Sequence, residues 1–186
     1  MSFKTKVETT ANARMATGIW IALVATLSVA GSLAFACAAP LAAIAALAGA
    51  KMDRTSGVVL VSLAWLTNQI VGFTLLGYPQ TADAFAWGAA IGAASVVAFL
   101  AVKSVTASLS SGPVGLVVSL AASFTAYELC LALAGVLLAG SAEAFSLDVI
   151  ARVLAVNFIA FIGLLALHHL ATALLAGATP AEGTTR

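Results

Sequence analysis

Glu128 is the residue whose type and position most strongly suggest chemistry. It interrupts an otherwise uncharged, apolar stretch that runs over residues 113–139. A carboxyl group inside a lipid bilayer is costly, so it usually faces the interior of a helical bundle and often marks a functional site. The group could receive the cationic part of a solute, carry a proton or ligate a metal. The structural alternative is a neutral glutamic acid hydrogen-bonded to a neighbouring helix.

Uncharged polar residues fall at similar positions in two other apolar stretches. Asn68 and Gln69 lie in the middle of residues 57–78, and Trp65 precedes Asn68 by three positions, which places a ring and an amide on one helical face. Asn157 lies at a comparable depth in the last stretch. Amides also bond between membrane helices without any ligand, so that alternative stays open. The predicted substrate-binding residues are Glu128, Asn68, Gln69, Asn157 and Trp65.

Motifs of common enzyme and metal chemistry are missing from the sequence. It contains no Walker A loop, no H-E-x-x-H, no G-x-S-x-G and no C-x-x-C. His168 and His169 are adjacent, so their side chains point in different directions and cannot act as an i, i+4 metal-binding pair. The net charge is +1 and the basic residues are scattered, which disfavours nucleic-acid binding. We therefore predict no enzyme, no catalytic residue, no metal, no cofactor and no nucleic-acid partner.

The composition indicates that lipid surrounds the residues named above. Of the 186 residues, 62% are hydrophobic and only 8% are charged, and the mean hydropathy is +1.12. Soluble domains are about a quarter charged, so this chain cannot cover itself with a water-exposed surface. We predict an all-α integral membrane protein with a polar tail over residues 1–14, one transmembrane domain over 15–178 and a second polar tail over 179–186.

The number of spans depends on the first apolar stretch. A spanning helix needs about 20 apolar residues, and residues 57–78, 84–105, 113–139 and 147–176 each fit one span. Residues 17–50 are too long for one span and short for two, with candidate turns between Gly31 and Pro40. A cleaved signal peptide is disfavoured because the apolar run is longer than the usual core of such a signal.

Positive charges favour two spans in that stretch, and therefore six in total. Lysine and arginine are enriched in cytoplasmic loops. Six spans with both termini in the cytoplasm leave a single basic residue, Arg152, outside. We predict a bundle of six transmembrane helices, the first two short or re-entrant, in a cytoplasmic (inner) membrane of the bacterial type. The basic residues placed inside are Lys4, Lys6, Arg14, Lys51, Arg54, Lys103 and Arg186.

Small residues recur at every fourth position in two segments. Such stripes let helix backbones approach closely in lipid, either within this bundle or against a partner subunit. The stripe of the first segment comprises Gly18, Ala22, Thr26, Ala30, Ala34 and Ala38, and that of the fourth comprises Ala84, Gly88 and Gly92.

In this outline the chain resembles the substrate-capture subunits (S components) of energy-coupling-factor vitamin and metal transporters. These are small six-helix proteins with cytoplasmic termini, an outward-facing site and a small-residue stripe on the first helix. The resemblance implies that Ala22, Thr26 and Ala30 dock a transmembrane coupling subunit, which works with an ATPase module. No substrate-specific motif matches, and Met1-Ser2-Phe3 lacks the N-terminal histidine motif of the metal-type members.

Two functions are consistent with these features. The first is a transport subunit that binds a small polar or vitamin-like solute within the bundle and takes its energy from a partner. The second is an accessory or assembly subunit of a larger membrane complex that has no ligand of its own.

Overall fold

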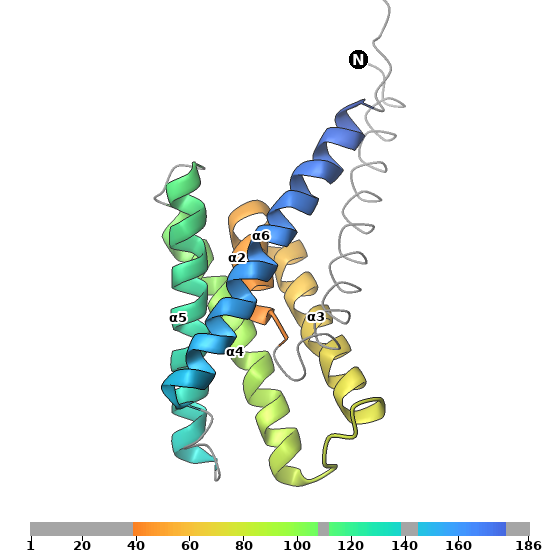
Figure 1. The fold of residues 1–186 in the computed structure, drawn as a ribbon, viewed down its shortest axis with the longest axis vertical. Helices are drawn as coiled ribbons and strands as arrows, with labels where there is room; N and C mark the ends of the chain where they lie inside the picture. The colour runs from red at the N-terminus through yellow and green to blue at the C-terminus, as the bar shows by residue number, and fades with distance from the viewer. Residues whose placement is uncertain (1–38, 108–111, 139–144, 178–186) are drawn as a thin grey trace, which may run out of the picture.

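The described part of the chain is entirely helical. The computed structural model describes residues 39–107, 112–138 and 145–177, without the side chains of 174–177. Figure 1 shows the long helices around a short one, and no strand occurs in these ranges. The helices are α2 (Leu41–Lys51), α3 (Arg54–Thr74), α4 (Ala82–Thr106), α5 (Pro113–Leu137) and α6 (Leu147–Gly177).

Four of these helices, α3 to α6, are long and apolar enough to cross a membrane. This confirms the prediction of a helical, multi-pass membrane protein, and each predicted span from residue 57 onward corresponds to one of these helices. The predicted polar tails and the first small-residue stripe lie outside the described residues. The same holds for most of the region between Gly31 and Pro40, where the turn was predicted.

Local signals in the sequence explain where several helices begin. Asp53 precedes α3, and its Oδ1 accepts a hydrogen bond of 3.0 Å from the backbone N–H of Ser56. That bond lowers the pKa of the Asp53 carboxyl group. Thr81 caps α4 in the same way, through a bond of 3.2 Å from the backbone N–H of Ala84. Pro113 occupies the first turn of α5, where its missing N–H costs nothing.

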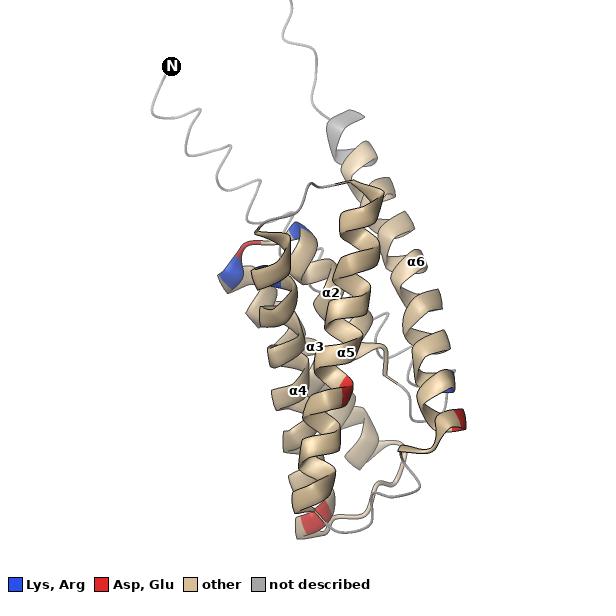
Figure 2. Ribbon diagram, turned by 90° about the vertical axis from the view of Figure 1, so that its left-hand side faces the viewer, with Lys and Arg blue, Asp and Glu red and all other residues tan. Residues whose placement is uncertain are grey.

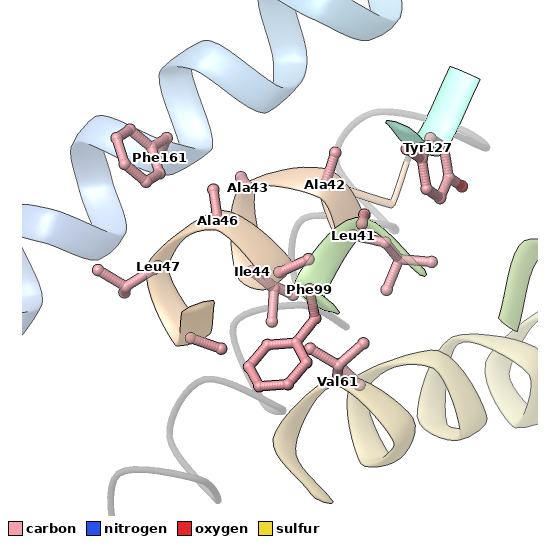
Figure 3. Packing of buried hydrophobic residues seen from close by; sticks show 14 of the residues in the cluster. Leu41, Ala42, Ala43, Ile44, Ala46, Leu47, Val61, Phe99, Tyr127 and Phe161 are labelled. Carbon is pink, nitrogen blue, oxygen red and sulfur yellow. The ribbon is translucent and has the colours of Figure 1, made fainter. Parts of the chain in front are cut away.

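The short helix α2 forms the centre of the molecule. Every residue from Leu41 to Gly49 is buried, and α2 packs against all four long helices. Figure 3 shows Val61, Phe99, Tyr127 and Phe161, from four different helices, around it. A helix that is apolar on all sides belongs in a core, which explains this position.

The length of α2 distinguishes it from its neighbours. Its 11 residues extend over about 16 Å, roughly half of the ~30 Å hydrocarbon thickness. It is therefore a half-length helix enclosed by helices that are long enough to span.

Small residues allow α5 to pack closely on α2 and α4. Gly115, Ser119, Ser123 and Tyr127 follow each other at intervals of four and are all buried. The first three have small side chains, so the backbones of neighbouring helices can approach. The last helix, α6, packs mainly on α2 and has little contact with α5.

The interface between α3 and α4 uses the second small-residue stripe. A Cβ atom added to Gly88 would lie 2.6 Å from Gln69 Oε1, and one added to Gly92 would lie 2.6 Å from Trp65 Cε2. The two glycines therefore face α3 of the same chain. Their interpretation as a docking face for a partner subunit is wrong, because the side chains of α3 already fill the space above them.

Candidate functional site

The N-terminal end of α2 lies deep inside the bundle, held by two residues from other helices. Asn157 Oδ1 accepts a hydrogen bond of 2.9 Å from the backbone N–H of Ala43. Ser123 Oγ donates a hydrogen bond of 2.7 Å to the backbone oxygen of Ala42. Ser123 and Asn157 each come ten positions after the start of their helix, which is about 15 Å along α5 and α6. The helix end therefore lies near the middle of α5 and about a third of the way along the longer α6.

Asn157 acts as a helix cap supplied by another segment of the chain. Pro40 occupies the N-cap position of α2 and makes no side-chain capping bond. The first N–H groups of a helix have no partner inside it, and an oxygen of the N-cap side chain usually accepts from one of them. Here Asn157 provides that oxygen, while its Nδ2 donates to the backbone oxygen of Val153 at 2.9 Å. Both ends of the amide are therefore satisfied by protein groups, and only 1% of Asn157 is exposed.

One polar group at this helix end has no acceptor among the described residues. Ala42 N–H lies between the bonded amides of Leu41 and Ala43, and the described residues offer it no acceptor. Ala42 has no exposed surface. A buried donor without an acceptor is costly, so a polar or anionic group placed here would stabilise the end of α2.

Glu128 lies on α5, five positions beyond Ser123 and about 7 Å further along the helix axis. It is half-buried, and its carboxyl group has neither a hydrogen bond nor an ion pair within the described residues. In Figure 2 the charged residues gather at the ends of the helices, and the acidic residue of α5 is the exception. The adjacent Tyr127 is buried and lies beside Leu41 at the start of α2 (Figure 3). A carboxyl group is thus present close to the depth of the α2 end.

Trp65 and Gln69 have a different environment. The Trp65 indole donates from Nε1 to the backbone oxygen of Gly88 at 2.8 Å, and Gln69 packs over the same glycine. Both side chains therefore face α4. Asn68 is half-buried on the same helix.

The five predicted site residues are thus distributed over several interfaces. Asn157 faces α2, Trp65 and Gln69 face α4, and Glu128 lies at the edge of the buried face of α5. The described contacts bring Asn157 to the end of α2, whereas Trp65 and Gln69 lie against α4. The predicted arrangement of all five around one solute remains a prediction.

Ser123 is the residue that sequence reasoning missed at this site. Its signal was its place in the four-residue repeat Gly115-Ser119-Ser123, which resembles ordinary helix packing. The sequence predicts a turn between Gly31 and Pro40, and Pro40 itself directly precedes a helix. Neither sequence signal reveals that the helix after Pro40 begins in the middle of the bundle.

The histidines lie toward the other end of α6. The rings of His168 and His169 are 6.0 Å apart and meet edge to face. Within residues 39–107, 112–138 and 145–177, no group of three or more histidine, cysteine, aspartate or glutamate residues could hold a metal ion.

Comparisons with known proteins identify no relative of this chain, so its function has to be inferred from the geometry described above. The chain gives no significant match to any protein-family model, curated protein or solved structure.

Proposed function

We propose that the protein is a transport subunit that binds a small polar or vitamin-like solute within its helical bundle and depends on a partner for energy. The observation that carries the proposal is the start of α2 at the middle of the bundle. Discontinuous helices whose ends lie near the bilayer midplane form the substrate sites of many transporters. An amide donor and a carboxyl group near such an end would suit a solute with both acceptor and cationic groups.

Each residue has a defined role in this proposal. Glu128 receives the cationic group of the solute, and Ala42 N–H at the end of α2 donates to an acceptor on it. Asn157 holds the helix end in position. Trp65, Asn68 and Gln69 remain predicted lining residues on α3, although Trp65 and Gln69 contact α4 in the described structure.

The membrane arrangement in the proposal has six spans and cytoplasmic termini. Residues 17–50 contribute the first two, and α2 is the short second one, following a turn that dips into the membrane. The orientation is supported by the basic residues at the α2–α3 connection and the acidic residues at the opposite helix ends. Because the sequence has no nucleotide-binding motif, energy would come from a coupling subunit and an ATPase module.

Replacing Glu128 tests this proposal most directly. We expect native mass spectrometry of the protein purified from its own membranes to show a bound small molecule that is lost from Glu128→Gln. The matched control is Asp148→Asn, at the exposed start of α6, which should keep the molecule. A solute that stays bound at the same occupancy in Glu128→Gln would contradict the assigned site.

An accessory subunit is the second candidate, favoured by the surface next to Glu128. Ala121, Thr125 and Ala132 are exposed on the adjoining side of α5, and small residues near a polar group allow a partner helix to approach. The same spectra distinguish the two candidates. A stoichiometric protein partner without any small molecule would support the accessory role and contradict the transport role.

A further inference from the structure

A basic cluster occupies the end of the bundle where α2 meets α3. Lys51 is the last residue of α2, Arg54 is the first residue of α3, and both are exposed. Lys103, near the end of α4, donates from Nζ to the backbone oxygen of Met52 between them. Three positive charges from three helices are therefore gathered at a single connection. In Figure 2 most of the blue segments lie at this end of the molecule.

The charges in this cluster are not neutralised within the described part of the chain. Among the described residues the only carboxylate beside them is Asp53, and its oxygen is used to cap α3 through Ser56 N–H. No described ion pair involves Lys51, Arg54 or Lys103. His168 of α6 interacts electrostatically with Lys51, so the last helix also reaches this end. The three cations minus Asp53 leave an excess of about two positive charges there at neutral pH.

The position of the cluster along the helices points to the ligand. Lys103 lies 20 positions after Asp83 on α4, which is about 30 Å and matches the hydrocarbon thickness. If Asp83 lies at one membrane surface, Lys103 lies at the level of the lipid headgroups on the other. Basic residues at this level attract anionic phospholipids, and arginine binds phosphate oxygens in a bidentate manner.

We infer that Lys51, Arg54 and Lys103 form a binding site for the phosphodiester headgroup of an anionic phospholipid. Lys103 is held by the Met52 oxygen and retains two further N–H donors. Arg54 and Lys51 are exposed and able to close on the phosphate from the ends of α3 and α2. The single negative charge of a bound phosphodiester would offset about half of the excess charge at the connection between the central helix and its neighbour. This inference is independent of any solute bound near Glu128.

The test measures lipid binding to the full chain in detergent by native mass spectrometry. The probes are phosphatidylglycerol, zwitterionic phosphatidylcholine and inorganic phosphate. We expect phosphatidylglycerol to bind most tightly. In the double variant Lys51→Gln/Arg54→Gln the Kd for phosphatidylglycerol should rise by about thirty-fold, because each surface cation contributes about a five-fold factor in affinity. Arg152→Gln, at the start of α6, is the matched control and should leave the Kd unchanged.

Three results with the parent protein and the double variant would overturn the inference. They are an unchanged Kd in the double variant, equal affinity for phosphatidylcholine, and inorganic phosphate displacing the lipid at similar concentration, which would indicate a site for the free ion. The charge-conserving variant Lys51→Arg/Arg54→Lys guards against misfolding, since it should retain binding within a few-fold. Loss of binding in that variant while the chain stays folded would also contradict a site based on charge.

Discussion

At the scale of single residues, the role of Asn157 shows how a polar group inside a membrane bundle can be structural. A buried asparagine at mid-span resembles a ligand-binding residue. In the structure its oxygen and nitrogen bond to Ala43 and Val153, respectively. Asn157 therefore contributes to the proposed solute site by fixing the end of α2. Glu128 differs, because no described residue satisfies its carboxyl group.

Replacing Asn157 with leucine should destabilise the protein by about 1–3 kcal/mol, since the buried Ala43 N–H would lose its acceptor. Asn157→Asp keeps an oxygen in the same place and should cost less. Ser123→Ala removes the hydrogen bond that Ser123 Oγ donates to the Ala42 oxygen. Its free energy of unfolding provides a second comparison for Asn157→Leu. Denaturant unfolding in detergent measures the free energies. Equal stability of Asn157→Leu and the parent protein would show that the cap is unimportant.

At the scale of elements, glycines control how closely helices approach. Gly92 in α4 and Gly163 in α6 should respond differently to replacement by alanine. Gly92→Ala places a methyl group 2.6 Å from Trp65, which is bonded to Gly88, and should destabilise by about 1–3 kcal/mol. Gly163→Ala in α6 meets no atom within 4 Å and should be neutral or stabilise by up to about 1 kcal/mol. Thermal unfolding of both variants checks this contrast. If Gly92→Ala is as stable as the parent protein, the Trp65 ring does not pack over Gly92.

At the scale of the whole molecule, the antiparallel order of the helices separates the charges into two groups. The α2–α3 connection carries Lys51 and Arg54, whereas the α3–α4 connection at the other end of α3 is followed by Asp83. With the basic group in the cytoplasm, a cysteine at Thr55 should be protected from an impermeant thiol reagent added to intact cells. A cysteine at Gln80 should be labelled, in a background lacking Cys37 and Cys130. The opposite labelling pattern would reverse the orientation.

The sequence by itself determined the class of the protein and the positions of its long helices. Runs of apolar residues are bounded by charges, by Pro113 and by capping residues such as Thr81, and these local signals act over a few neighbouring positions. The membrane requires each run to satisfy its own backbone hydrogen bonds, so a long apolar run has little alternative to a helix. For this reason the spans from residue 57 onward could be predicted closely.

Only the tertiary structure decided what the polar and small residues do. Asn157 bonds to Ala43, 114 positions earlier in the chain, and Ser123 bonds to Ala42, 81 positions earlier. Gly88 and Gly92 proved to be internal because the side chains covering them come from α3. A side chain's partner depends on which helices become neighbours, and apolar composition does not specify neighbours when lipid and protein interior are equally apolar. The sequence could therefore identify membrane-embedded polar residues, whereas packing determined which of them support the bundle and which remain available for a ligand.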